Sequence, residues 1–418
     1  MPKLTVTLKQ HSPLIHFQGN QSGAILRASE VKPKLDKFLR KHVFEGGFEE
    51  YKQYLIGYDD TKKEEDFKEK EAFDYKLRII TDISKIRKLD IRGSIKSLYF
   101  ANMGSQNESE EKDEIISVFT DDDVVLEFFT LHEKLKDKIN ENIEFFLAIN
   151  NFGTRQSKGF GSFYVKNPKN EINKSIEKAC MCNGINKYLS IQYNKEKYPD
   201  IMQDISIIYP LMKSGLNYPD HPREFDSKTG KKKINFNKKL KNQSYHKGFL
   251  FRYMLDKNIG NEKRFIKENF FKINDRIKND GKPKKYVRAM LGICDGVDFK
   301  EYSRNGKIRY VSDIDRFQSP ILFKIIENKL FIIPKKIPEE MFNKRFEFSN
   351  THLIRGEKKT DKKTIYTPRC DQFNLEDFLC EFAEYFNNRL EESKINNLFE
   401  KKLRRAKTRK IQIRQVVK

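Results

Sequence analysis

The chain has 418 residues, a formal net charge of +23 and a hydrophobic content of 37%. This length exceeds what a single hydrophobic core usually supports, so we expect at least two domains. The charge favours a polyanionic partner, although a lysine- and asparagine-rich chain without tryptophan is also typical of an AT-rich genome. No segment approaches the roughly 20 apolar residues that cross a bilayer, and MPKLTVTLKQ alternates like a strand instead of a signal peptide. We therefore expect a cytoplasmic protein without a membrane contact.

The five cysteines are few and odd in number, which predicts reduced thiols and no disulfide framework. Cys180 and Cys182 form one CxC pair, and no second pair follows at the spacing of a zinc site. A mononucleotide P-loop would need Gly-x4-Gly-Lys-Ser/Thr, which GTRQSKGFG at 153–161 does not supply. We expect neither a metal nor a cofactor.

The first 170 residues carry alternating patterns of strands and two helical patterns. Leu4, Val6 and Leu8 alternate with polar residues, which predicts a half-buried strand. From Ser29 an amphipathic helix is predicted, and residues 131–147 predict a second one. Further strands are predicted at 75–80, 115–119, 124–129 and 161–165. The order of strand, helix, strands, helix and strand is that of a ferredoxin-like, split βαβ unit.

The second half predicts helices at 245–256, 262–272 and 284–291, a hairpin at 319–334 and a helix at 375–390. SPLIHF at 12–17 and SPILFK at 319–324 each open a predicted strand after Ser-Pro, and duplication of the unit would explain both this likeness and the chain length. After Glu400, seven of the ten residues 401–410 are basic, which predicts a disordered arm or a helix that orders on a polyanion. We predict domains at 1–170 and 171–395 and a basic tail at 396–418.

Segment 153–161 combines glycines with Arg155 and Lys158. Glycine lets successive N–H groups point into one concavity that binds an anion, and the two cations would add charge there. Phe160, Phe163 and Tyr164 are candidates for stacking on unpaired bases, with burial in the core as the alternative. The segment therefore predicts a site for a sugar-phosphate backbone.

LRASEVKPKL at 26–35 places Arg27, Lys32 and Lys34 at the opening of the first predicted helix, and Lys37 and Arg40 also fall off its apolar side. The N–H groups of a helix N-terminus favour anions as well. A solvated helix face is the alternative interpretation. We expect this helix to lie beside segment 153–161, so that the two segments form one track for a polyanion.

LRASEVKPKLDKFLR after SPLIHF resembles the LRxSSIKGxLR signature of RAMP-superfamily CRISPR proteins, and SKGFGSFYV resembles their glycine-rich loop and following strand. DRFQSPILFKI, with Arg316, is similar to a downstream Arg-x-x-Ser-Pro segment. Within the superfamily the likeness is greatest to the first Cmr subunits of type III-B effector complexes.

This resemblance implies an α+β fold of tandem ferredoxin-like (RRM-like) domains with helical insertions. It implies an RNA-binding subunit without catalytic residues that holds CRISPR RNA and helps to capture target RNA for antiviral defence, in contact with other effector subunits. Carried over by position, the RNA path comprises Arg27, Lys32, Lys34, Lys37, Arg40, Arg155, Lys158, Gly159, Phe160, Gly161 and Arg316.

The alternative is a metal-independent RAMP endoribonuclease that processes precursor CRISPR RNA, with His11, His16 and Lys32 as candidates for acid-base catalysis. His16 lies between two apolar residues, where a structural histidine is the commoner interpretation. The glycine-rich segment ends a first domain here, whereas the processing enzymes carry theirs near the C-terminus, which favours a binding subunit. A ribosome or nucleoid protein held by charge alone stays open.

Overall fold

The computed structural model describes residues 3–16, 25–67, 71–90, 116–216, 223–225, 232–234, 246–270, 281–293, 299–300, 307–311, 316–354, 357–391 and 409–416. The segments 226–231 and 235–243 of the predicted basic stretch, and the basic residues 401–408, lie outside this range. Within the described residues, no helix is both long and apolar enough to cross a membrane.

The first 165 residues build a four-stranded antiparallel sheet in the order β2-β5-β1-β6. Its elements are β1 (Lys3–Gln10), α1 (Ala28–His42), β2 (Lys76–Ile80), β5 (Val124–Phe129), α5 (Glu133–Ala148) and β6 (Phe163–Val165). The predicted ferredoxin-like unit is therefore confirmed, because two split βαβ units produce this order. The connections add α2 (Phe48–Tyr51), α3 (Glu64–Phe67) and a hairpin of β3 (Arg87–Asp90) and β4 (Ile116–Phe119).

The helices of this first unit cover only one face of its sheet. Val6 and Leu8 of β1 face the same core as Leu126 and Phe128 of β5, and the apolar sides of α1 and α5 close that core. The alternation of burial along β1 follows from this, since successive strand residues point to opposite faces.

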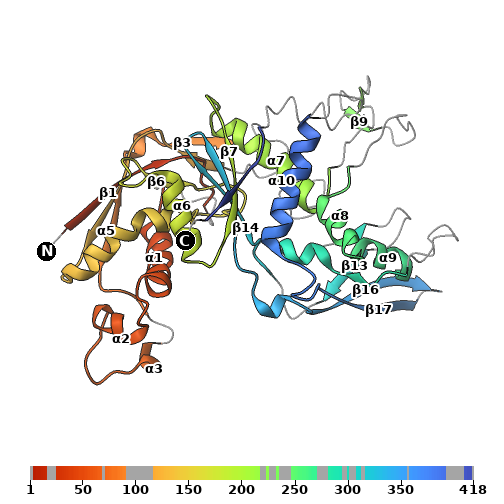
Figure 1. Ribbon diagram of the computed structural model, residues 1–418, viewed down its shortest axis with the longest axis horizontal. Helices are drawn as coiled ribbons and strands as arrows, with labels where there is room; N and C mark the ends of the chain where they lie inside the picture. The colour runs from red at the N-terminus through yellow and green to blue at the C-terminus, as the bar shows by residue number, and fades with distance from the viewer. Residues whose placement is uncertain are drawn as a thin grey trace.

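A second sheet repeats the topology in the order β14-β15-β7-β18. Its elements are β7 (Lys187–Gln192), α7 (Tyr198–Lys213), β14 (Ile321–Ile326), β15 (Lys329–Pro334), α10 (Leu375–Glu391) and β18 (Gln412–Gln415). The order is again that of two split βαβ units, so the chain is an α+β protein of tandem ferredoxin-like units. Figure 1 shows the units side by side along the long axis, with β7 and β14 in the middle of the molecule.

Helical and sheet insertions enlarge the second unit. Between α7 and β14 lie β8 (Arg223–Phe225), β9 (Lys232–Ile234), α8 (Phe249–Asp256), β10 (Gly260–Asn261), α9 (Glu262–Phe270), β11 (Lys284–Lys285), β12 (Phe299–Lys300) and β13 (Lys307–Val311). Between β15 and α10 lie β16 (Arg345–Ile354) and β17 (Glu357–Tyr366), which join β12 and β13 in a further sheet. The third predicted helix of this region is a short 3-10 turn at Val287–Leu291.

Both faces of the second sheet are buried along most of β7, β14 and β15, whereas the edge strand β18 is exposed. Leu189, Phe323 and Ile332 belong to the core that α7, α8 and α10 complete. Leu322 and Phe331 belong instead to the core of the first unit. The uninterrupted burial of β14 reflects this, because a strand covered on both faces has no solvent side. Helix α6 (Ile172–Met181), which links the units, packs on α5.

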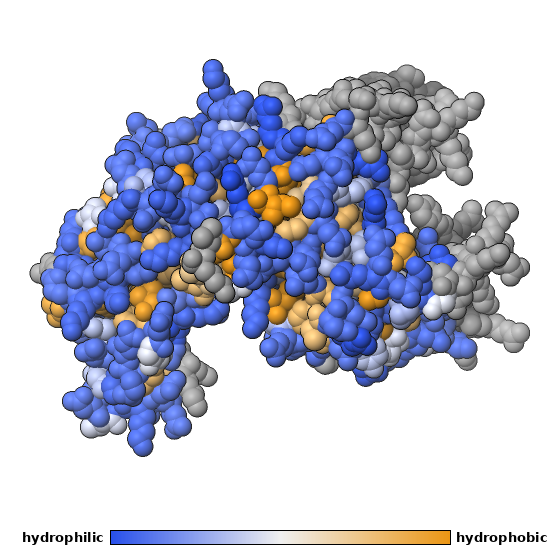
Figure 2. All heavy atoms as spheres, in the orientation of Figure 1, coloured by the Kyte–Doolittle hydropathy of each residue, from blue (hydrophilic) through white to orange (hydrophobic). Residues whose placement is uncertain are grey.

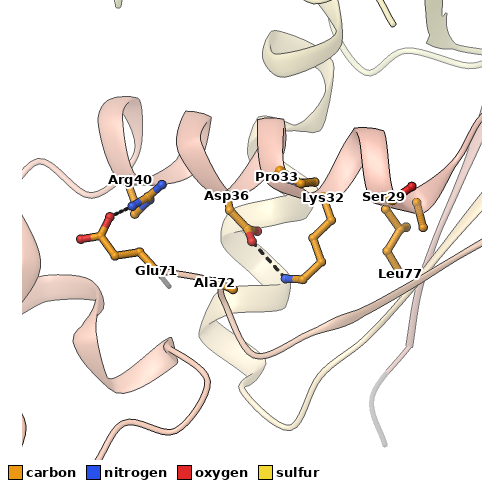
Figure 3. A pocket seen from close by; sticks show the side chains of 9 residues that line it. Ser29, Lys32, Pro33, Asp36, Arg40, Glu71, Ala72 and Leu77 are labelled. Atoms are coloured by element: carbon orange, nitrogen blue, oxygen red, sulfur yellow. Dashed lines mark hydrogen bonds and ion pairs between the residues drawn. The ribbon is translucent and has the colours of Figure 1, made fainter. Parts of the chain in front are cut away.

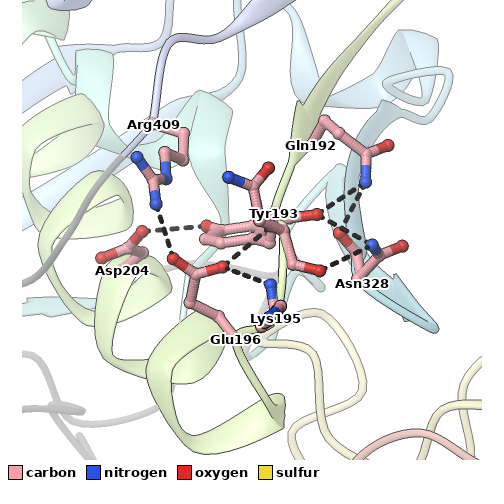
Figure 4. Close-up of polar contacts among 8 residues, drawn as sticks. Gln192, Tyr193, Lys195, Glu196, Asp204, Asn328 and Arg409 are labelled. Carbon is pink, nitrogen blue, oxygen red and sulfur yellow. Dashed lines mark hydrogen bonds and ion pairs between the residues drawn. The ribbon is translucent and has the colours of Figure 1, made fainter.

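The end of the chain differs from the predicted tail. Within 396–418, β18 pairs with β7, and Ile411 just before it is 2% exposed. Arg409 forms an ion pair of 2.7 Å with Glu196, and its hydrogen bond is the main cause that lowers the pKa of that carboxyl to about 2 (Figure 4). A disordered arm or a helix over the whole of residues 401–418 is thus wrong, because the alternating segment IQIRQ supplies the fourth strand of the second unit.

The two Ser-Pro segments are not equivalent in the fold. SPILFK enters β14, the second strand of its unit, whereas SPLIHF follows β1, the first strand of its unit. The strand predicted in SPLIHF is wrong in its described part, since only Leu14 makes an isolated bridge, to Val118. The unit is duplicated, but the repeated hexapeptide does not mark matching positions.

Candidate nucleic-acid interface at the domain junction

The glycine-rich segment 153–161 connects α5 to β6. Its backbone has positive φ at Gly153, Arg155, Gly159 and Gly161. A Cβ at Gly161 would overlap the carbonyl oxygen of Phe152, and one at Gly153 would overlap that of Ile15. These two glycines are therefore needed where other backbone packs directly against the turn.

The predicted anion-binding nest is wrong, because protein acceptors occupy most amides of this segment. The N–H groups of Gly153, Thr154, Lys158, Gly159 and Gly161 donate to Glu30 Oε1 and to the carbonyls of Ile15, Arg155, Gln156 and Pro13 over 2.8–3.3 Å. A phosphate could use these groups only by breaking hydrogen bonds that hold the turn in place. The amides serve the fold instead.

Three predicted RNA-contacting residues of the segment face the second unit. Phe160 is 0% exposed in the core of that unit, so the prediction that it contacts RNA is wrong. A Cβ at Gly159 would meet Ile205 of α7 at 2.8 Å. The Lys158 ammonium lies over the ring of Tyr209, also from α7. The segment therefore works first as a joint between the units.

Polar contacts reinforce this joint. The Asn151 amide donates to the Phe323 carbonyl over 2.9 Å. Lys324 of β14 is 0% exposed, and its ammonium donates to the carbonyls of Asn150 and Phe163 over 2.8 and 3.0 Å. Burial lowers the pKa of Lys324 well below its ordinary value. Strand β14 is thus fixed to the end of α5 and the start of β6.

Helix α1 lies beside the joint, as the sequence predicts. The Lys34 ammonium donates to the Asn151 carbonyl over 2.8 Å and to Gln156 Oε1 over 2.6 Å. One turn earlier, Glu30 accepts the N–H of Gly153 over 3.0 Å. Burial lowers the pKa of Lys34 to about 8, and the nearby charge of Lys335 adds to the effect.

Partly desolvated cations gather at this place. Burial lowers the pKa of Arg155 to about 10, and it also lowers the pKa of Lys335, which follows β15. Lys335 repels Lys34, whereas Glu30 favours its charged form. Because burial disfavours the charged form of each of these groups, an incoming anion would offset part of that cost. We call Lys34, Arg155 and Lys335 the junction cations.

The cations of α1 divide between two sides of the helix. Lys32 donates to the Phe73 carbonyl over 2.7 Å and pairs with Asp36 over 3.1 Å, and Arg40 pairs with Glu71. These side chains line a cavity of about 450 Å³ between α1 and residues 71–77 (Figure 3). Both cations are neutralised there, so the structure separates Lys32 and Arg40 from the junction.

The remaining predicted residues are dispersed. Lys37 is exposed three residues after Lys34, so helical spacing places it on the same side of α1. Arg27 occupies the N-cap position of the helix, and its side chain makes no capping hydrogen bond there. Arg316 is exposed in the second unit, and no contact recorded among the described residues joins it to segment 153–161. Sequence reasoning missed Lys335, whose signal was the basic pair that directly follows the predicted hairpin at 319–334.

The histidines proposed for the endoribonuclease do not form an open catalytic site. His11 Nδ1 accepts the N–H of Glu327 over 3.0 Å, and burial first, then Lys324 and Lys9, lowers the pKa of His11 to about 3. A lone pair engaged in this way cannot take a proton from a ribose hydroxyl. His16 is 7% exposed. Among the described residues, no three His, Cys, Asp or Glu side chains group as a metal site requires.

Comparison with solved structures gives distant similarities. The crystal structure of apo Cmr1 from Pyrococcus furiosus shares 9% identity at a TM-score of 0.39, over 81% of this chain and 90% of that one. A chain in the cryo-EM structure of the type III-B Cmr-beta bound to cognate target RNA shares 13% identity at a TM-score of 0.24, over 40% and 58% of the two chains. No curated protein matches.

Two protein families match consecutive parts of the chain. The Cmr1 C-terminal domain matches residues 245–405, and the Cmr1 N-terminal domain matches residues 1–216. The N-terminal match extends through β7 and α7, so strands from both matched regions build the second sheet. Since one match alone spans more than half of the 418 residues, the chain belongs to the Cmr1 family.

Proposed function

We propose that this chain is a non-catalytic, RNA-holding subunit of a type III-B CRISPR effector complex in the cytoplasm. CRISPR RNA, target RNA and neighbouring effector subunits are the partners that membership of the Cmr1 family implies. One observation supports the RNA contact above the others: Lys34 joins α1 to segment 153–161, next to Arg155 and Lys335. A phosphate at this place would replace the water that burial has removed from the junction cations.

The shape of the molecule agrees with this proposal. Figure 2 shows a hollow between the projection that carries α2 and α3 and the body of the second unit. Helix α1 borders this hollow in the same view (Figure 1). A single strand that enters along α1 would meet exposed Lys37 and then the junction cations. Phosphate contacts of this kind position RNA without reading its sequence.

The test replaces Arg155 and Lys335 together by alanine and measures binding of a labelled single-stranded RNA by anisotropy across a salt series. Each lost phosphate contact should reduce the slope of log K against log salt by about 0.7, so the double variant should lose about 1.4. The matched control, Lys134→Ala/Lys138→Ala, removes two cations from α5 and should leave the slope unchanged. Equal slopes for all three proteins would refute the junction as an RNA contact.

A second measurement separates binding from cleavage. Incubation of the protein with a labelled CRISPR repeat RNA in EDTA should leave the RNA intact, because the His11 lone pair is engaged by Glu327. Cut ends at one position, lost in a His11→Ala variant, would instead establish the endoribonuclease.

A further inference from the structure

The face of the first sheet that points away from α1 and α5 carries a regular pattern. The register places Lys76, Phe129 and Lys3 in one row across β2, β5 and β1. The next rows are Arg78, Glu127 and Thr5, and then Ile80, Val125 and Thr7. Lys9 of β1 lies one step further along the same face, since side chains of one strand face alternate every two residues.

Across β2, β5 and β1, most of this face is open to solvent in the part of the chain that the structure describes, although Glu127 at its centre is 8% exposed and Tyr164, the β6 residue beside Lys9, is buried. Lys76, Arg78, Thr5 and Lys9 are exposed, and Ile80 is 38% exposed. By contrast, β14 and β15 of the equivalent second sheet are covered on both faces. We call Lys3, Lys9, Lys76, Arg78 and Phe129 the open-face set.

The open face has an excess of positive charge. Glu127 is the one acid in these three rows, and Lys3 pairs with it. Lys9, Lys76 and Arg78 form no ion pair with any residue that the structure describes. An uncompensated group of cations on an exposed surface attracts a polyanion more than a neutral or basic protein surface.

Phe129 adds an aromatic ring to these charges. The ring is partly exposed between Lys76 and Lys3, and the Lys3 ammonium lies 5.8 Å from its centroid. A flat sheet with one accessible ring between cations suits an unpaired base stacked on the ring and phosphates beside it. A duplex offers no free base face, so a single strand is the better fit.

We propose that the open-face set is a second contact for single-stranded RNA, on the side of the first sheet opposite α1. The inference rests on the proposed function in one respect, namely that the chain handles RNA. The inference adds a separate surface, which holds another stretch of the same RNA or a second RNA molecule. One stacked base and three free cations bind with little sequence preference.

The test uses two changes on the open face, measured with a labelled oligouridine RNA by anisotropy. Lys76→Glu/Arg78→Glu should lower the affinity about tenfold or more at low salt and flatten the salt dependence. Phe129→Leu should lower the affinity about fivefold with an unchanged salt slope, because it removes a stacking partner and no charge. The matched control, Lys134→Glu/Lys138→Glu on α5, should bind like the wild type.

Crosslinking then locates the RNA. Oligomers that carry 4-thiouridine should crosslink to peptides of β2 or β5 in the wild type, and Lys76→Glu/Arg78→Glu should abolish these crosslinks while those near segment 153–161 remain. If every crosslink maps near segment 153–161 and the open-face variants bind normally, the second contact is refuted and the junction stands. If the wild type instead crosslinks only at β2 or β5 and not near segment 153–161, the junction is refuted and the second contact stands.

A protein partner is the competing occupant. If the open-face variants bind RNA normally but no longer co-purify with another effector subunit, this surface is a protein interface and the RNA proposal is wrong. Circular dichroism and a melting curve for each variant confirm that the sheet is intact.

Discussion

The two ferredoxin-like units share one topology but differ in what covers the second face of each sheet. In the first unit most of that face is exposed across β2, β5 and β1, and β1 alternates Lys3, Thr5, Thr7 and Lys9 with its apolar residues. In the second unit the first unit covers it, and all six residues of β14 are buried. The same fold therefore provides a free surface in one copy and a structural joint in the other, and the strand sequence decides which.

The largest expected contrast is between two phenylalanines. Phe160 is 0% exposed at the joint, so Phe160→Ala should lower the free energy of unfolding by about 3–5 kcal/mol. Phe129 on the open face is only partly buried, so Phe129→Ala should cost about 1 kcal/mol. Denaturant unfolding of both variants measures the difference. Similar losses for both would mean that the open face is not open in solution.

Two isoleucines at the end of the chain offer a smaller contrast in stability. Ile411 precedes β18, is 2% exposed, and exchanges two hydrogen bonds of 2.8 Å with Asn387. Deletion of residues 409–418 should therefore lower the free energy of unfolding by about 2–3 kcal/mol. Ile411→Ala should account for much of this loss. Ile413→Ala is the control, because Ile413 is 36% exposed. An unchanged melting temperature after the deletion would restore the interpretation of a free arm.

Periodicity predicted most of the regular elements because each is governed by one buried face. The pattern of Val31, Leu35 and Leu39 predicts α1, and the pattern of Phe378, Phe382 and Phe386 predicts α10. The periodicity does not predict the fourth strand of the second unit, because all four residues of β18 are exposed at the sheet edge and follow a basic run. Pattern alone also could not tell that SPLIHF lacks a strand.

The site was predicted only in outline. The sequence predicts that α1 lies beside segment 153–161, and Lys34 confirms it. It could not distinguish Lys34 from Lys32, two residues away, because which side of a helix meets the joint depends on packing between distant segments. The sequence also predicts that Phe160 contacts RNA, because an aromatic residue beside glycine is compatible with a buried core as well as with a stacking surface. Lys335 comes from the other unit, 180 residues after Arg155.

The smallest expected effect tests whether the junction differs from the open face in its response to pH. Lys34 has a pKa of about 8 in the free protein because burial disfavours its charge, and a bound phosphate would raise that pKa. Binding therefore takes up protons near pH 8, and the RNA affinity should fall a few-fold between pH 7.5 and about 9.5, as Lys34 loses its charge. Anisotropy over this range, with calorimetry in buffers of different ionisation enthalpy, measures both quantities. Lys34→Arg keeps the charge and should remove most of the decline, whereas the same decline in Lys34→Arg would assign it to other groups and leave the junction without its distinguishing property.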